Sequence, residues 1–266
     1  MWLEGNDMTQ INNLTSAATA LVITCEHGGN RIPAPYRYLF LNCGPLLESH
    51  RAFDAGALAM ARELAWHFGA PLLSSTVSRL VVDLNRSIGH RKLHMEAIRR
   101  LPAAIRQEII EHYYQPYRTE AEELVARGIA RRGRVIHISC HSFTNNLNGV
   151  VRDADIGLLY DPARPGESAL CANWKSAFKA SAPDLVVRRN FPYKGRDDGF
   201  TPALRKKFPS DVYLGIELEI NQKNLLPPAW QWKTLRESII TSLNTVLSGY
   251  SMTAQPAKQH GAGLTL

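Results

Sequence analysis

The 266-residue sequence lacks the features of a membrane or secretory protein. None of its apolar runs reaches the roughly 18 residues that a membrane-spanning helix needs. The first residues, MWLEGNDMTQINN, contain no basic stretch followed by an apolar one, so they do not resemble a secretory signal. We therefore expect a cytoplasmic protein that does not bind membranes, whose oligomeric state the sequence leaves open.

Cysteine is scarce, and the four cysteines lie far apart without a CxxC pair: Cys25, Cys43, Cys140 and Cys171. This spacing argues against a disulfide framework and against a zinc knuckle built from thiolates. We expect these thiols to be reduced and buried.

Acidic residues are outnumbered, since 24 Asp and Glu face 31 Lys and Arg, which gives a formal net charge of +7. The densest basic cluster, between Arg127 and Arg134, has no interleaved aromatic residues and no nucleic-acid-binding motif. The C-terminal end of a helix explains this cluster as well, because cations there complement the helix dipole. A positive field would also concentrate a small anionic substrate, so we expect such a substrate and no nucleic-acid partner.

The length and the hydrophobic content of 45% fit one large α/β domain. Residues 1–17 are polar, and residues 251–266 lack apolar periodicity, so both segments are predicted to be flexible. The single catalytic domain is expected to span residues 18–250.

Short apolar runs alternate with amphipathic segments along the chain. The runs predict strands at residues 20–25, 71–75, 79–84, 134–140, 184–189 and 212–220. The amphipathic segments predict helices at residues 54–68, 168–179 and 230–247. Another helix is predicted to begin at Pro102 and to continue until Pro116 interrupts the pattern, and a further helical run is predicted to end near Gly128. This order predicts a three-layer α/β fold with a mostly parallel or mixed sheet and helices on both faces, although 71–75 and 79–84 could form a hairpin.

Polar side chains gather at the ends of four predicted strands, where active sites of such sheets lie. They are Glu26 and His27, then Asp83, Asn85 and Arg86, then His141, and finally Glu217 and Glu219. Turn geometry alone favours Gly, Asn, Asp and Ser at strand ends. The histidines and the arginine therefore need another explanation.

His27 and His141 suggest a metal, because a catalytic zinc site commonly uses imidazoles with a carboxylate and leaves one position open. Each histidine taken alone could equally be a hydrogen-bonded core residue. His137 has the same strand parity as His141, but its position within the run predicts a core residue. The remaining histidines are expected in solvent: His50, His67, His90, His94 and His112.

Asn85 and Arg86 place an amide and a planar cation side by side, which suits a substrate carboxylate, although a strand-end salt bridge is the alternative. Asp83 is the candidate for orienting this arginine or a metal-bound histidine. Glu217 and Glu219 share one side of a buried strand, so at least one of them needs a specific partner. A glutamate beside zinc can deprotonate water and later protonate the leaving nitrogen.

Six motifs, taken in their order along the chain, resemble the N-formylglutamate amidohydrolase family, whose fold is similar to that of zinc carboxypeptidases and aspartoacylases. They are CEHGGNRIP, HRAFDAGA, SRLVVDLNRS, HISCHSF, NFPYKGRDDGFT and ELEINQ, and together they span about residues 23–225. The resemblance implies a zinc-carboxypeptidase-like (phosphorylase/hydrolase-like) fold. It also implies a zinc hydrolase that cleaves an N-acyl amino acid, with N-formylglutamate and water giving glutamate and formate.

The resemblance also assigns roles to single residues. It implies one zinc ion per chain on His27 and His141, Arg86 with Asn85 as the catalytic clamp on the substrate carboxylate, and Glu219 rather than Glu217 as general base. Asn30 stands where carboxypeptidases carry a glutamate ligand, so the third ligand is expected to be Asp54, with Glu26 as the alternative.

The motif NFPYKGRDDGFT resembles the family's substrate loop and supplies three expected contacts, Asn190, Tyr193 and Arg196. The residues after it, PALRKKF, lack the histidine that members acting on formylglutamate often carry there. This departure leaves the acyl group open. A second hypothesis is a degenerate member of the family that binds an anionic metabolite without cleaving it.

Overall fold

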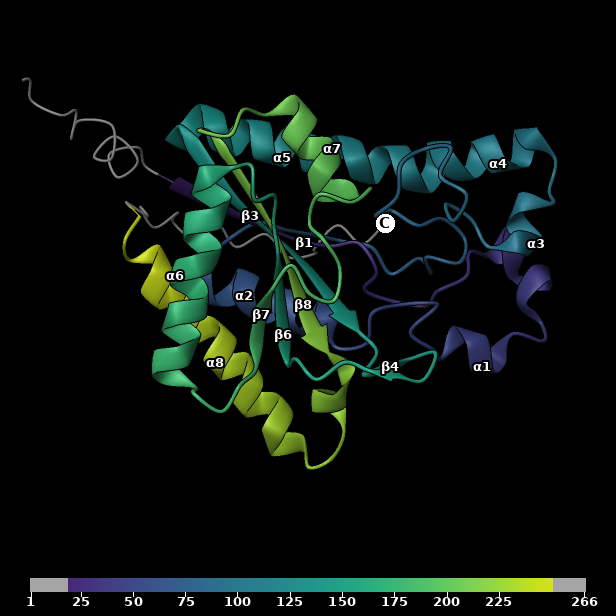
Figure 1. Cartoon of the computed structure of the whole chain (residues 1–266). Coiled ribbons are helices and arrows are strands. Elements are labelled where there is room, and N and C mark those ends of the chain that lie inside the picture. The colour runs from purple at the N-terminus through teal and green to yellow at the C-terminus, as the bar shows by residue number, and fades with distance from the viewer. Residues whose placement is uncertain (1–18, 251–266) are drawn as a thin grey trace, which may run out of the picture.

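A six-stranded mixed sheet runs through the centre of the computed structural model, which describes residues 19–250 (Figure 1). The strand order is β2-β1-β3-β8-β6-β7. The bounds are β1 Thr19–Cys25, β2 Leu72–Ser74, β3 Arg134–Phe143, β6 Ile156–Leu159, β7 Val187–Arg189 and β8 Tyr213–Asn221. Strands β2, β1, β3 and β8 are parallel neighbours, whereas β6 pairs antiparallel with β8 and parallel with β7. The predicted mixed α/β sheet is confirmed.

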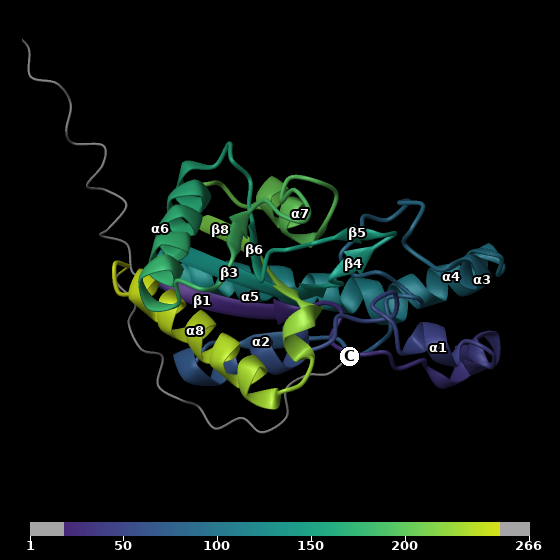
Figure 2. The ribbon, with the colours of Figure 1, turned by 60° about the horizontal axis from the view of Figure 1, so that its bottom comes forward.

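Helices cover both faces of this sheet (Figure 2). On one face lie α2 (Ala57–Phe68), α6 (Pro165–Ser181) and α8 (Ala229–Leu247). On the other face lie α5 (Gln115–Arg132) and α7 (Phe200–Lys207). Between residues 19 and 250, no helix is long and apolar enough to cross a membrane. The segments predicted to be flexible, 1–17 and 251–266, lie outside the described residues.

Shorter elements complete the chain and lie mostly in its loops. They are α1 Gly44–Leu47, α3 Glu96–Arg99, α4 Ala103–Ile109, a π-helical turn Ile110–Tyr114, two 3-10 helices Ala34–Phe40 and Gln222–Leu225, and a hairpin of β4 Asn146–Leu147 and β5 Val150–Val151. In the basic cluster between Arg127 and Arg134, Arg131 and Arg132 lie in the last turn of α5, whereas Arg134 begins β3.

Alternation along the central strands separates the core from the polar residues. In β8, Ile216, Leu218 and Ile220 pack into the core under α2, α6 and α8. Successive side chains of a strand point to opposite faces, so Glu217 and Glu219 face the side of α5 and α7. The same parity places His137 and His141 of β3 on that side. His137 is a core residue as predicted, and its ring bonds to the hydroxyls of Thr24 and Tyr213 at 2.8 and 2.7 Å.

The predicted strand at residues 79–84 is wrong, and with it the hairpin alternative. The segment is a buried loop, in which the Val81 amide donates to the Ser78 carbonyl at 2.9 Å and the Asp83 amide donates to the Leu93 carbonyl at 2.8 Å. Its apolar side chains are buried in the same core cluster as those of α5, but its backbone does not pair with a strand of the sheet. A short apolar run shows burial but does not distinguish a strand from a buried loop.

The break predicted at Pro116 is also wrong. The backbone stays helical from α4 through the π-helical turn into α5, and Pro116 occupies the first turn of α5. Inside a helix proline removes one amide donor, and the π-helical turn that ends directly before Gln115 and Pro116 is the local change in hydrogen-bond pattern that accompanies it here.

His94, predicted to lie in solvent, is buried instead. Its Nδ1 lies 2.6 Å from the carbonyl oxygen of Val81, so the loop at residues 79–84 encloses it. The cysteines are unpaired, as expected, and all but the half-buried Cys43 are buried.

Gly157 of β6 provides a test of the packing at the antiparallel edge of the sheet. A Cβ atom there would lie 1.8 Å from the carbonyl oxygen of Phe191, whereas a Cβ atom at Gly44 would meet nothing within 4 Å. We expect Gly157→Ala to lower the free energy of unfolding by about 2 kcal/mol or more, because overpacking forces the backbone to shift. Gly44→Ala should change it by less than about 0.5 kcal/mol. Urea denaturation measures both, and equal stabilities would contradict this packing.

Candidate active site

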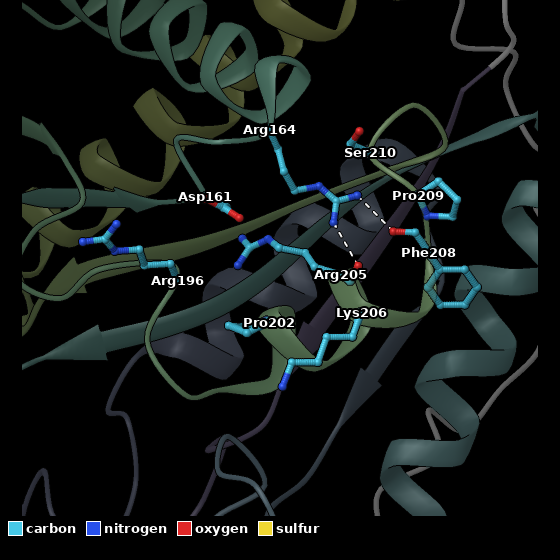
Figure 3. Close-up of a pocket in the computed structure, with 9 residues that line it drawn as sticks. All are labelled: Asp161, Arg164, Arg196, Pro202, Arg205, Lys206, Phe208, Pro209 and Ser210. Carbon is cyan, nitrogen blue, oxygen red and sulfur yellow. Dashed lines mark hydrogen bonds between the residues drawn. The ribbon is translucent and has the colours of Figure 1, made fainter.

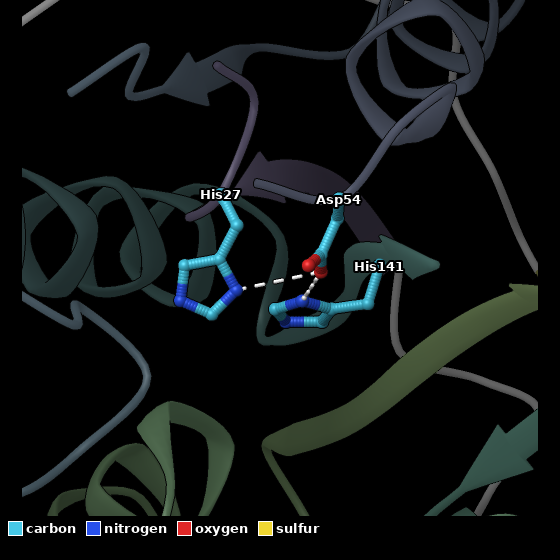
Figure 4. Close-up of side chains that lie close together, drawn as sticks. All are labelled: His27, Asp54 and His141. Carbon is cyan, nitrogen blue, oxygen red and sulfur yellow. Dashed lines mark hydrogen bonds and ion pairs between the residues drawn. The ribbon is translucent and has the colours of Figure 1, made fainter. Parts of the chain in front are cut away.

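Three buried side chains from different parts of the chain point toward one another: His27, Asp54 and His141 (Figure 4). Their potential ligand atoms all lie within 4.8 Å of one another. The Asp54 Oδ2 atom is 3.4 Å from Nδ1 of His27 and 2.8 Å from Nδ1 of His141. Two imidazoles and a carboxylate form a donor set that suits zinc.

The fold explains how these residues meet. His27 is the second residue after β1, and His141 lies near the end of the neighbouring strand β3. Asp54 precedes α2, and its amide donates to the His27 carbonyl at 2.9 Å, which holds the loop against the end of β1. Gly56, with a φ of 80°, then allows the chain to turn into α2.

The outer nitrogen of each histidine is bound to a second carboxylate. The Nε2 atom of His27 lies 2.7 Å from Asp83, and the Nε2 atom of His141 lies 2.9 Å from Glu26. Carboxylates in this position fix the tautomer and orientation of metal-ligating histidines. Glu26 therefore lies behind His141, outside the three-residue cluster.

Glu26 is itself held on both oxygens. The Tyr117 hydroxyl donates to its Oε1 at 2.8 Å, and the Ser139 hydroxyl donates to its Oε2. Burial alone would raise the pKa of Glu26, but the hydrogen bond and charge of His141 and the Ser139 hydroxyl hold it below its usual range. Glu26 is thus an ionised, fully buried partner of His141.

Sequence analysis missed Arg79, which joins the two carboxylates that flank His27. Its guanidinium donates to Asp54 at 3.2 Å and to Asp83 at 2.7 Å, and its side chain is 24% exposed. Burial alone would raise the pKa of Asp83, but the charges of Arg79 and His27 lower it below its usual range. The spacing of Arg79 and Asp83 within SRLVVDLNRS is the signal that could have revealed this pair.

Glu217 and Glu219 have different surroundings. Glu217 accepts a hydrogen bond from the Thr201 hydroxyl. Glu219 is opposite His141 in the register of β3 and β8, and its buried Oε2 has no hydrogen-bond partner in the described part of the chain. Burial raises the pKa of Glu219 to about 8, helped by the charges of Asp54 and Glu217 and opposed by His141.

Asn85 lies beside the cluster rather than within it, and Arg86 is the next residue in the chain. The Asn85 amide nitrogen is 3.4 Å from Nε2 of His141, while its oxygen accepts from the Phe200 amide. The Arg86 Nη1 atom donates to the Asp198 carbonyl at 2.7 Å, and its buried Nε has no partner among residues 19–250. The Tyr114 hydroxyl donates to the Arg86 carbonyl at 2.8 Å.

The three residues expected to contact substrate are spread over a loop. The Asn190 side-chain oxygen accepts from the amides of Tyr160 and Gly195 at 3.1 and 3.0 Å, so Asn190 stabilises the loop itself. Tyr193 is 45% exposed, and its hydroxyl is 3.2 Å from Nη1 of Arg152. Arg196 lines a separate hollow (Figure 3).

That hollow, of about 400 Å³, also contains Arg164 and Arg205. Both arginines already have structural partners. Arg164 donates to the carbonyls of Phe208 and Tyr213 at 3.0 and 3.1 Å, and Arg205 pairs with the buried Glu167 at 3.0 Å. None of the residues that line this hollow belongs to the histidine cluster.

Fold and site together define a mixed α/β protein with a buried two-histidine, one-carboxylate cluster at the carboxyl edge of its parallel strands. The chain belongs to the N-formylglutamate amidohydrolase family, whose family model matches residues 19–226. The resemblance identified from the six motifs is thereby confirmed. A search of curated protein sequences gave no match.

Solved structures share this fold. The gene product Atu2144 from Agrobacterium tumefaciens is 29% identical, with a TM-score of 0.74 over 88% of this chain and 93% of the other. An N-formylglutamate amidohydrolase from Ralstonia eutropha JMP134 is 20% identical, with a TM-score of 0.63 over 88% and 95% of the two chains. At that identity the second match supports the fold alone.

Replacing Arg79 tests whether its positive charge neutralises the buried carboxylates Asp54 and Asp83. Arg79→Met leaves Asp54 and Asp83 without their shared cation, so we expect the metal-free protein to lose about 3 kcal/mol of unfolding free energy. Arg100→Met removes an exposed ion pair with Glu96 and should cost less than about 1 kcal/mol. Urea titration in the presence of a chelator measures both, and equal losses would show that Arg79 does not neutralise the site.

Proposed function

We propose that this chain is a zinc-dependent amidohydrolase that cleaves the amide of an N-acyl amino acid resembling N-formylglutamate, giving the free amino acid and a carboxylate. The observation that carries the proposal is the cluster of His27, Asp54 and His141, with Glu219 opposite His141 and its buried Oε2 without a partner among the described residues. Membership of the amidohydrolase family supports the same reaction class.

The residues present fit one zinc ion. Two imidazoles and the Asp54 carboxylate supply three protein ligands, the number that leaves a catalytic zinc with an open position. The buried Glu219 Oε2 lacks a partner among residues 19–250, as expected of a group whose partner is a reacting molecule. Zinc, when bound, would lower the pKa of water and polarise the acyl carbonyl.

Glu219 is the proposed general base. A carboxylate with a raised pKa and a free oxygen can accept a proton from the attacking water and deliver it to the leaving nitrogen. Glu217 is less suited to this role because its carboxylate accepts the Thr201 hydroxyl. The outer carboxylates, Asp83 and Glu26, keep both histidines oriented through the reaction.

Arg86 and Asn85 are the proposed clamp for the substrate carboxylate. The buried Nε of Arg86 has no partner in the described chain, so a bound carboxylate would satisfy this N–H group. Tyr193, beside Arg152, adds a polar contact at the rim. We propose that Asn190 contributes by shaping its loop, and that Arg196 adds positive charge farther from the cluster.

The alternative of a binding protein without turnover has two grounds, Asn30 in place of a glutamate ligand and the altered sequence at the substrate loop. The Asn30 amide donates to the Leu47 carbonyl at 3.0 Å, and Asp54 supplies the carboxylate of the cluster. Asn30 therefore does not argue for a degenerate site.

Replacing the proposed base tests the mechanism. We expect Glu219→Gln to lower kcat by about a hundredfold or more with zinc content unchanged, because positioned proton transfer contributes on that scale. Glu217→Gln, a change on the same strand face, should have a much smaller effect. Hydrolysis of N-formylglutamate and of longer N-acyl amino acids provides the assay. Full activity in the Glu219 variant with loss in the Glu217 variant would transfer the role to Glu217.

Zinc affinity separates the two carboxylates that were candidates for the third ligand. We expect Glu26→Gln to weaken zinc binding by about 10- to 100-fold, because it alters only the outward partner of His141. Asp54→Ala removes a ligand and should weaken binding further. Competition with a chromogenic chelator gives both affinities. A larger loss in the Glu26 variant would make Glu26 the ligand.

A further inference from the structure

A second cavity, of about 400 Å³, lies between the loop after Arg86 and the helices α3 and α4. Ile88, Leu93 and Ile110 give it apolar walls. Its lining includes five basic side chains and no carboxylate: His90, Arg91, His94, Arg99 and Arg106. Its volume is in the range of pockets that hold small molecules.

The three arginines of this cavity carry uncompensated charge. None of them forms an ion pair with a carboxylate of residues 19–250. Arg99 donates to the Arg91 carbonyl at 3.3 Å, and Arg106 donates to the Arg99 carbonyl at 3.1 Å. Carbonyl oxygens position a guanidinium without neutralising its charge. Each guanidinium also has further N–H groups that form no hydrogen bond with a described residue. The hollow near Arg196 differs, because there Glu167 neutralises Arg205.

His94 adds a hydrogen-bond acceptor to this basic cavity. His94 is one of the residues that line the cavity, although it is only 8% exposed. A carbonyl oxygen only accepts, so the Nδ1 atom 2.6 Å from the Val81 carbonyl carries the proton. Burial and the charge of Arg106 lower the pKa of His94 despite this hydrogen bond, which favours the neutral ring. Nε2 then has a lone pair, and it bonds to no described residue.

We propose that this cavity binds a small oxyanion that also carries an O–H group, of which hydrogen phosphate is the simplest example. The arginines attract the charge and donate hydrogen bonds to its oxygens. The O–H group donates to Nε2 of His94. Sulfate has the same charge and nearly the same shape but no hydrogen, so it would place an oxygen lone pair against the lone pair of Nε2.

The cavity is separate from the histidine cluster, although its wall touches the loop that carries Asp83. The Leu93 carbonyl, in that wall, accepts the Asp83 amide at 2.8 Å. None of the cavity's lining residues belongs to the cluster. The proposal therefore does not depend on the proposed hydrolase activity.

Titration calorimetry on the full chain with inorganic phosphate and sulfate tests this proposal at about pH 8, where phosphate is mostly a dianion that retains one hydrogen. We expect phosphate to bind at least about tenfold more tightly than sulfate, the factor for one hydrogen bond to a charged partner. Zinc-loaded and zinc-free protein should give the same phosphate affinity. Equal affinities for the two anions, or an affinity that depends on zinc, would overturn the proposal.

Variants of exposed arginines locate the bound anion. The double change Arg91→Gln and Arg99→Gln should weaken phosphate binding by about tenfold or more. Arg100→Gln is the matched control, because Arg100 follows α3 directly, pairs with Glu96 and does not line the cavity. If the double variant binds phosphate as tightly as the control, the anion lies elsewhere and the proposal is wrong.

Discussion

The structure depends on one constraint, which is that charged groups buried at the ends of β1 and β3 must have partners. A buried charge without a partner costs more than folding can supply, so ionised side chains gather into a network or lose their charge. Asp54 is the centre of that network, since it meets both imidazoles and Arg79. Glu219 is the exception: its buried Oε2 has no hydrogen-bond partner in residues 19–250, and burial shifts its pKa upward. The other buried carboxylates of the site have charged or hydrogen-bonding partners, whereas the Glu219 Oε2 atom has none in the described chain. A reacting molecule would therefore fit beside Glu219.

Much of the fold could be predicted because periodicity and burial agree in the long elements. Strands β1, β3 and β8 and helices α2, α6 and α8 are near the positions that their apolar patterns predict. The apolar patterns gave a wrong prediction where a segment is buried but does not pair with a strand, as in the loop at residues 79–84. They also missed β6, whose four residues are too few to show a period. The conformation of such short segments depends on tertiary contacts, which a sequence pattern does not contain.

The candidate site was predictable to the extent that strand ends converge. His27 and His141 meet because adjacent parallel strands end at the same edge, and Asp54 joins them from a loop. Arg79 was missed because its role depends on two carboxylates 25 and 4 residues away folding toward it. Asn190 matched a motif for substrate contacts, yet its side chain bonds to its own loop. Residue type predicts chemistry, whereas side-chain direction depends on neighbours that only the folded chain provides.

The continuous helical segment around the π-helical turn has a consequence for the geometry of the site. Tyr114, the last residue of that turn, reaches the backbone beside the proposed carboxylate clamp, and Tyr117 in the first turn of α5 reaches Glu26 behind His141. One helical segment therefore contacts both the backbone of the proposed clamp and the carboxylate behind His141. A shift of this segment along its axis would carry both contacts in the same direction, so the two contacts are coupled through a helix rather than through loops.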